Sequence, residues 1–324
     1  MRWPRQLTIP LWARAIVSIA LIALVLSQLH PGEAVRRLSD GEWHWFVLAL
    51  GSMLLALAIG AFRWQLFLKA AGIARSLSHA VRVYAMGAFA NSFLPTGFGG
   101  DAVRAWLAGS PGTRAVAAVT VIVDRATMLA MVTAFAWLAY ALDPDSVPSV
   151  LVQTLAAVTA LVVVGGLVAA VALRSATRPG SSLRRASWVA ASAEAACACF
   201  RGSVVWRTAP LGLAYEALAV FSLWLVARSI SLDLSFALLA VVVPAVLVVT
   251  ALPFSLGGLG LREGSYVVLL HQAGVSTTDG ALLSLLATLL FALATLPGAF
   301  ALLKRSSTRD TGLPAPTSPQ ELAS

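Results

Sequence analysis

Seven apolar stretches dominate the sequence, and each is long enough to cross a lipid bilayer as a helix. A helix needs about 20 apolar residues to span the hydrocarbon core, where its backbone hydrogen bonds must all be made internally. The stretches lie at residues 11–29, 43–62, 115–141, 149–173, 208–228, 234–251 and 280–303. The sequence therefore predicts an all-α, polytopic membrane protein.

Composition excludes the main alternative classes. Of the 324 residues, 59% are hydrophobic and 11% are charged, which excludes a water-soluble globular protein and a disordered chain. The net charge of +9 indicates basic cytoplasmic loops rather than a nucleic-acid partner. The two cysteines, Cys197 and Cys199, have no histidine or further cysteine nearby, so no metal and no other cofactor is expected.

Basic residues predict which side of the membrane each connection occupies. Arginine and lysine gather before the first stretch, in the central loop and after the last stretch, and Arg63, Lys69, Arg75 and Arg82 follow the second stretch. Cytoplasmic loops carry such an excess. The connection holding Asp143 and Asp145 and the turn holding Asp279 have no basic residue and are expected outside. The N- and C-termini are therefore expected in the cytoplasm.

Two further regions, 78–109 and 252–275, are apolar but interrupted by proline and glycine, which end or kink helices. We expect 252–275 to cross as a broken helix and 78–109 to dip in and return, which gives about eight crossings. An inverted repeat would need an odd number of crossings between the two regions, whereas this topology has four. Residues 1–305 would form one membrane domain, and the Pro/Ser/Thr-rich segment 306–324 a disordered cytoplasmic tail.

Both interruptions share one pattern, Leu-Pro-x-x-x-Gly-Gly-x-x-x-Arg, which begins at Leu94 and again at Leu252. Five matching positions at identical spacing predict an internal repeat, with half-repeats at about 43–141 and 208–303. Glycine exposes backbone N–H groups, and an arginine near the start of the next half-helix adds its charge to the positive helix end.

Interrupted backbone at membrane depth is tolerated only inside protein or along a wet cavity, and paired interruptions are typical of transporter substrate sites. The alternative is that both segments form tight loops at the membrane surface, with their arginines reaching the interface. Asp124 and Arg125 also lie inside a predicted span, where an ionised side chain costs about 2.5–3.5 kcal/mol on insertion scales. They either neutralise each other or reach a cavity shared with the interruptions. Glu216 is a weaker candidate of the same kind, and Asn91 could equally be a helix cap.

The candidate residues form two groups. Those expected to bind substrate are Arg104, Arg262, Arg125, Asn91, Gly99, Gly100, Gly257 and Gly258. Those expected to form ion pairs or to couple transport to protons are Asp101, Asp124, Glu263 and Glu216.

Several of these residues belong to motifs that resemble those of a known family. The motifs are Asn91-x-x-Leu94-Pro95, Gly100-Asp101-x-x-Arg104, Asp124-Arg125 and Pro253-x-Ser255-x-Gly257-Gly258-x-Gly260-x-Arg262-Glu263. Over about residues 10–305 the chain is similar to the lysylphosphatidylglycerol synthase transmembrane region family, also described as flippase-like.

The resemblance implies a bacterial inner-membrane protein. Members fused to an aminoacyl transferase domain are thought to move a modified phospholipid between leaflets, and others occur beside glycosyltransferases that handle polyprenyl-linked sugars. This chain ends soon after its last span, so no soluble transferase domain is expected.

The leading hypothesis is a lipid flippase with an arginine-lined polar cavity, rather than an enzyme. Its substrate would be an anionic or zwitterionic phospholipid or a polyprenyl-phosphate-linked glycolipid, and its partner a glycosyltransferase or lipid-modifying enzyme. Neither lysine follows a glycine as a phosphate-binding loop requires, so transport driven by ATP is not expected.

Two other hypotheses remain open. One is a membrane-embedded glycosyl- or phospho-transferase acting on a polyprenyl phosphate, with an outward acid as base or metal ligand. The outward acids are Glu33, Asp40, Glu42, Asp143 and Asp145. The other is a non-catalytic partner of a cell-envelope synthesis complex.

Overall fold

The computed structural model describes residues 11–93, 99–177, 187–251, 255 and 258–310. All regular secondary structure in these residues is α-helical, which confirms the predicted fold class. The first six helices are α1 (Leu11–Ser27), α2 (Pro31–Ser39), α3 (Trp43–Ala70), α4 (Leu77–Phe93), α5 (Gly99–Ala108) and α6 (Arg114–Leu142). The other six are α7 (Ser149–Thr177), α8 (Ser187–Cys199), α9 (Gly202–Ser229), α10 (Phe236–Thr250), α11 (Leu261–Gln272) and α12 (Thr277–Asp310).

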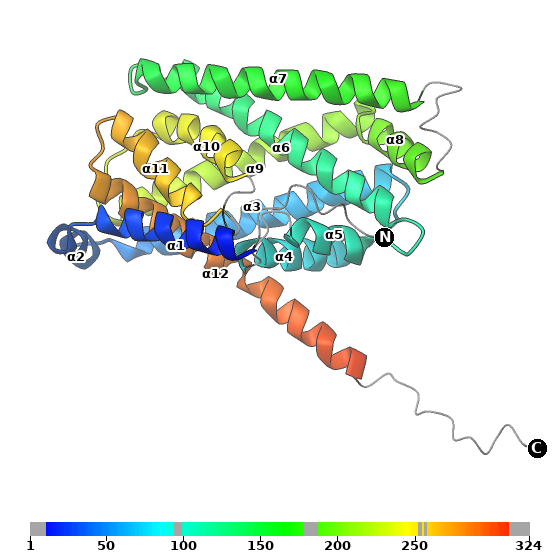
Figure 1. Cartoon of the computed structure of the whole chain (residues 1–324), viewed down its shortest axis with the longest axis horizontal. Coiled ribbons are helices and arrows are strands. Elements are labelled where there is room, and N and C mark those ends of the chain that lie inside the picture. Colours follow the sequence, from blue (N-terminus) through cyan, green and yellow to red (C-terminus); the bar gives the residue numbers. More distant parts are fainter. Residues whose placement is uncertain (1–10, 94–98, 178–186, 252–254, 256–257, 311–324) are drawn as a thin grey trace, which may run out of the picture.

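Long helices run along the longest axis of the molecule (Figure 1). We call one end of this axis the α2 end, where α3 begins and α6 and α9 finish, and the opposite end the α8 end. Within the described residues, five helices are long and apolar enough to cross a membrane: α3, α6, α7, α9 and α12. The pair α1 and α2, bent by 78°, would make a sixth crossing.

This number is smaller than the eight crossings expected from the sequence, because the segment 234–251 is not a separate crossing. It forms α10, which has 15 residues and spans only about 22 Å at 1.5 Å per residue. The hydrocarbon core is about 30 Å thick. Figure 1 shows α10 running from the α2 end to the middle and α11 returning to the same end. The broken crossing expected over 252–275 is therefore replaced by a helical hairpin.

The segment 78–109 dips in and returns, as expected, but from the other end. Helix α4 runs from the α8 end to the middle, and α5 turns back along it (Figure 1). Gly87 on α4 packs directly against the side chain of Arg104 on α5. Three long helices, α6, α7 and α9, separate the two hairpins, which is an odd number, as an inverted repeat requires. The half-repeats themselves stay a prediction.

Small residues allow the helices to approach closely, as is usual in membrane bundles. Helices α3 and α9 pack along much of their length, and Gly60 of α3 lies against Tyr84 and Tyr215. Gly298 of α12 touches the backbone of Ala85 on α4 and leaves no room for a Cβ atom. These contacts hold the α4–α5 hairpin inside the bundle.

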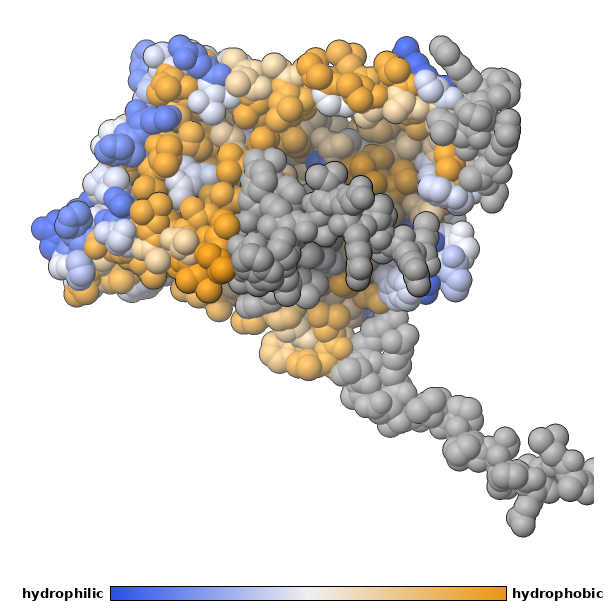
Figure 2. All heavy atoms as spheres, in the orientation of Figure 1, coloured by the Kyte–Doolittle hydropathy of each residue, from blue (hydrophilic) through white to orange (hydrophobic). Residues whose placement is uncertain are grey.

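Helix α7 is the least buried of the candidate spans in the described structure. Its buried residues are Leu151, Leu155 and Val158, all in the part nearest the α2 end. Figure 2 shows the molecular face recessed below α7, towards the α8 end. Helix α12 continues to Asp310, beyond residue 306, where the tail was expected to start. Residues 311–324 lie outside the described residues. So do two parts of the motifs, Gly257 and both Leu-Pro pairs.

The hairpin topology makes a prediction about accessibility. In a chain whose two native cysteines are replaced, single cysteines at Ser78 and Gly112 flank the first hairpin, and cysteines at Asp233 and His271 flank the second. Both members of a pair should react with a membrane-impermeant maleimide from the same side, and the two pairs from opposite sides. Labelling of Asp233→Cys and His271→Cys from different sides would show that the chain crosses the membrane between them. That result would refute the second hairpin.

Candidate functional site

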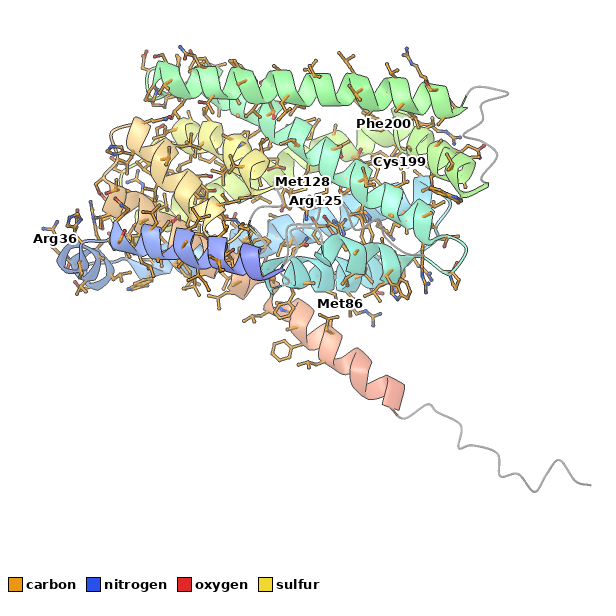
Figure 3. All side chains as sticks on the ribbon, viewed as in Figure 1. Arg36, Met86, Arg125, Met128, Cys199 and Phe200 are labelled. Atoms are coloured by element: carbon orange, nitrogen blue, oxygen red, sulfur yellow. The ribbon has the colours of Figure 1, made fainter. Side chains whose placement is uncertain are left out.

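Five charged side chains meet inside the bundle, and we call them the charge cluster. They are Arg63 of α3, Asp101 and Arg104 of α5, and Asp124 and Arg125 of α6. Asp124 and Arg125 lie ten and eleven residues after the start of α6 at Arg114, which is about 15 Å along the helix. Figure 3 places Arg125 near the middle of the long axis. The cluster therefore sits at membrane depth.

Asp124 is shared between two arginines. Its Oδ1 accepts a hydrogen bond from Arg63 Nη2 and its Oδ2 accepts one from Arg104 Nη2, both at 2.7 Å. The exposed fractions are 1% for Asp124, 1% for Arg63 and 3% for Arg104. Buried charges are tolerated when they are paired, so this carboxylate ties α3, α5 and α6 together.

Arg104 is enclosed by aromatic rings as well as by acids. Its guanidinium carbon lies 4.4 Å from the ring centroid of Trp64 and 4.4 Å from that of Tyr84, a favourable cation–π arrangement. Its Nη1 is also 3.6 Å from Asp101. Although the sequence marked Arg104 as a substrate-binding residue, the structure gives it little surface for a ligand.

Arg125 differs from the other two arginines of the cluster because its side chain is partly exposed. It forms two hydrogen bonds with Asp101, at 3.0 and 3.1 Å, yet 45% of its side chain is exposed, against 10% for that of Asp101. Asn91 holds α5, the helix that carries Asp101, because its Oδ1 accepts a hydrogen bond from Gly100 N at 2.8 Å. The structure thus brings together four predicted residues: Asn91, Gly100, Asp101 and Arg125.

The second interruption is built differently. Glu263 accepts hydrogen bonds from Gly260 N at 2.7 Å and from the Thr288 hydroxyl at 2.5 Å, so it caps α11 and ties it to α12 instead of pairing with Arg262. Gly258 and Gly260 adopt φ angles of 84° and 81°, which glycine accommodates readily.

Arg262 itself lies 5.8 Å from the ring centroid of Phe291 on α12, and no carboxylate among the described residues is within ion-pair distance. Arg104 is the sixth residue of α5 and Arg262 the second of α11. Arg104 is held by side chains of α3, α4 and α6, whereas Arg262 lies against α12. The two arginines therefore share no partner in the described part of the chain. Gly99 begins α5 and packs beside neither arginine in any described contact.

Glu216 and Arg63 form a second, incompletely paired site. Glu216 lies on α9 and is 2% exposed; its Oε1 has no hydrogen-bond partner among the described residues, and neither do Nε and Nη1 of Arg63. A Cβ atom added to Gly212, one turn before Glu216, would lie 2.8 Å from Arg63 Nη1. The two groups are therefore neighbours with unused hydrogen-bonding capacity.

Arg63 was misplaced by the sequence interpretation, which took it as a cytoplasmic residue after the second apolar stretch. The signal lay in Trp64, Phe67 and Leu68, which continue the apolar helix beyond it and are all buried. The outward acids of the transferase hypothesis lie on α2, just before α3 and just after α6, and these elements meet at the α2 end, apart from the cluster. The described residues contain no group of three histidine, cysteine or acidic side chains arranged to hold a metal.

A bundle of apolar helices with two helical hairpins and a buried charge cluster defines a polytopic membrane protein with a polar interior. The chain belongs to the lysylphosphatidylglycerol synthase TM region family, whose model matches residues 11–298. Membership points to a lipid-related function in the membrane. No curated protein matches the chain.

Removing the shared carboxylate should destabilise the fold. Asp124→Asn would leave Arg63 and Arg104 buried beside a neutral group, and breaking a buried pair in this way costs about 3–5 kcal/mol. Thermal unfolding in detergent micelles measures the change, with Asp233→Asn as the control because its side chain is 85% exposed. Equal melting temperatures for the two variants would show that Asp124 does not hold the cluster together.

Proposed function

We propose that this protein is a lipid flippase in which Arg125 binds the phosphate of the headgroup. The observation that carries the proposal is the combination of depth and accessibility at this residue. An arginine near the middle of a span is expensive unless it serves a polar pathway, and 45% of this side chain is exposed although its guanidinium is paired with Asp101.

The exposed later part of α7 would form one side of a lateral route for a lipid. Along its last two thirds the helix has no buried residue, and glycines 165 and 166 have open space around them. The recess in Figure 2 lies beneath this part of the helix. A headgroup entering there would reach polar groups of the bundle while its acyl chains remained in the bilayer.

The chemistry of binding follows from the present partner of Arg125. A guanidinium binds carboxylate and phosphate with the same two-pronged geometry, so a phosphate would replace Asp101 on Arg125. Arg262, on the hairpin that enters from the opposite end, has no acid partner among the described residues. It would form a second phosphate-binding site. Gly258, at the start of that hairpin's return helix, would add a backbone N–H group.

Glu216 is proposed to couple transport to protons. Its Oε1 is unpaired, and the charged groups that face it are Arg63 of α3 and Asp124 of α6. A carboxyl in this position can take up a proton when Arg63 is drawn to Asp124 and release it when Arg63 turns back. Such an exchange would supply energy from a proton gradient instead of from ATP.

The charges at the two ends of the molecule support an orientation. The helix ends and connections at the α8 end carry Lys69, Arg75, Arg82, Arg114, Arg174, Arg201 and Arg207. At the α2 end Arg37 and Arg228 are paired with Asp279 and Asp233. The positive-inside rule supports the proposal that the α8 end is cytoplasmic, with both termini on the cytoplasmic side of a bacterial inner membrane.

The proposed substrate is an anionic or zwitterionic phospholipid or a polyprenyl-phosphate-linked glycolipid, since all of these present a phosphate. The family membership supports a lipid, and the proposed partner is a glycosyltransferase or other lipid-modifying enzyme that makes or uses it.

Neutralising Arg125 should abolish the activity even in protein that is still folded, although Asp101 then loses an ion-pair partner. In proteoliposomes with a fluorescent phospholipid, Arg125→Gln is expected to slow leaflet exchange at least tenfold, because the phosphate loses its two-pronged partner. Arg125→Lys should retain part of the rate. Arg82→Gln, at an exposed arginine on α4, is the matched control. Exchange at the wild-type rate in folded Arg125→Gln would refute the phosphate site.

Proton coupling makes a separate prediction. An imposed transmembrane pH gradient should change the exchange rate of the wild-type protein, whereas Glu216→Gln should show the same rate with and without the gradient, because its side chain cannot titrate. The rates are compared in the same proteoliposomes, and melting temperatures establish that both proteins are folded. A full response to the gradient in Glu216→Gln would exclude this residue as the coupling group.

A further inference from the structure

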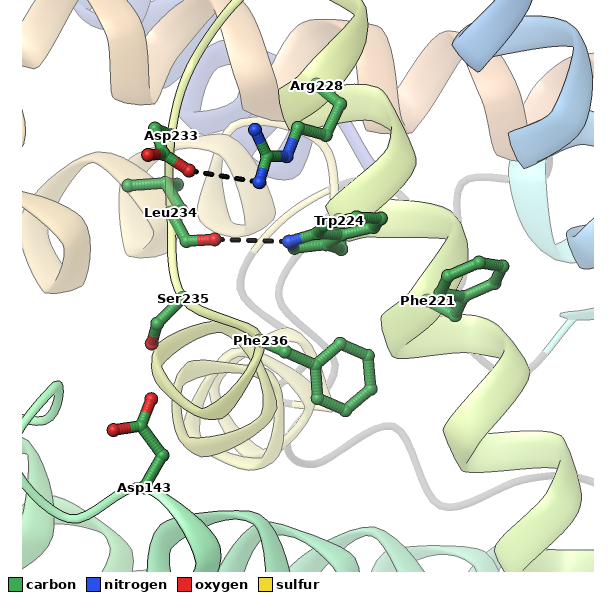
Figure 4. A pocket seen from close by; sticks show the side chains of 8 residues that line it. All are labelled: Asp143, Phe221, Trp224, Arg228, Asp233, Leu234, Ser235 and Phe236. Atoms are coloured by element: carbon green, nitrogen blue, oxygen red, sulfur yellow. Dashed lines mark hydrogen bonds and ion pairs between the residues drawn. The ribbon is translucent and has the colours of Figure 1, made fainter.

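A cavity of about 520 Å³ opens at the α2 end, away from the charge cluster. Its volume lies within the range of roughly 300–1,000 Å³ found for small-molecule sites. The lining residues that define its chemistry are Asp143, Phe221, Trp224, Arg228, Asp233 and Phe236 (Figure 4). They come from the end of α6, the last part of α9 and the start of α10.

One wall of this cavity is aromatic and held in place. Phe221 and Trp224 are stacked, with their ring centroids 5.8 Å apart and an angle of 16° between the planes. The Trp224 Nε1 group donates a hydrogen bond to the carbonyl oxygen of Leu234 at 3.2 Å. Phe236 is fixed from behind by an edge contact with Phe135 at 6.0 Å. The exposed fraction of Phe221 is 41%, so its ring is available for a ligand.

The polar groups of the cavity combine acceptors with one donor. Arg228 lies 4.9 Å from the Trp224 ring centroid and 3.2 Å from an Asp233 carboxylate oxygen. Asp143 points towards Ser235 across the opening (Figure 4), and its carboxylate takes part in no hydrogen bond or ion pair within the described structure. Its backbone is fixed, because its N–H closes the last turn of α6.

These groups match the surface of a sugar ring. The C–H face of a pyranose packs on an aromatic ring, whose π-face is negative, while its hydroxyls donate to carboxylates and accept from a guanidinium. A simple cation fits the cavity less well than a sugar, because Arg228 already lies against the Trp224 ring and neutralises Asp233. A simple anion would face two carboxylates, and an alkyl chain would leave the polar groups unpaired. We propose that this cavity binds a hexose-type sugar.

Two sources would present the same ring: a free sugar, or the headgroup of a glycolipid whose chains lie along α9. The experiment uses the full chain in phospholipid nanodiscs without glycoside detergents. Methyl hexosides and maltose are titrated by saturation-transfer NMR, and a monoglucosyl diacylglycerol is tested against phosphatidylglycerol by native mass spectrometry. Saturable binding of the soluble sugars indicates a free ligand, and selective retention of the glycolipid alone indicates a headgroup.

Matched variants test the assignment. Asp143→Asn and Phe221→Ala are each expected to weaken sugar binding at least tenfold, whereas Asp145→Asn, at an exposed acid of the same connection outside the cavity lining, should bind as the wild type does. Arg125→Gln should also bind sugar normally, so this inference and leaflet exchange succeed or fail separately.

Three results would overturn the sugar site: no saturable binding of any sugar or glycolipid by the wild type, equal affinities in Asp143→Asn and Asp145→Asn, or stronger binding of choline than of every sugar. Melting temperatures of all variants show which of them are folded.

Discussion

The pairing of Asp124 with two arginines is the interaction on which the rest of the structure depends. Charged side chains within an apolar bundle must neutralise one another, and Arg63 and Arg104 have one carboxylate between them at 2.7 Å from each. Because these residues lie on three different helices, the requirement fixes the position of the α4–α5 hairpin against α3 and α6. That position in turn sets Asp101 beside Arg125. The pairing of the partly exposed Arg125 therefore depends on how the buried Arg63 and Arg104 are held.

The two interruptions show how similar sequence motifs can serve different structural ends. In the first, Arg104 is immobilised between two aromatic rings and two acids, and its helix begins within the motif's glycines. In the second, Glu263 and Thr288 secure the helix start, so Arg262 is left without an acid partner in the described residues. Arg104 is therefore held more rigidly on the first hairpin than Arg262 is on the second.

The sequence predicted the helical membrane fold and the position of both interruptions, because hydropathy and the placement of proline and glycine act locally. It did not predict that α10 ends halfway, since a 15-residue apolar helix has the same composition as a short span. Arg63 was missed because it interrupts a hydropathy window although its helix continues. The enclosure of Arg104 depends on Trp64 and Tyr84, which are distant in sequence and come close only after folding.

In the proposed function, Arg125 acts as a ligand-binding charge, separately from its structural pairing with Asp101. The most direct measurement compares melting temperature and leaflet exchange in Asp101→Asn, Arg125→Gln and the double variant. Each single change leaves a partly buried charge unpaired, so the double variant is expected to recover much of the lost stability while its exchange remains abolished. A double variant that exchanges lipid at the wild-type rate would show that Arg125 does not bind the transported headgroup.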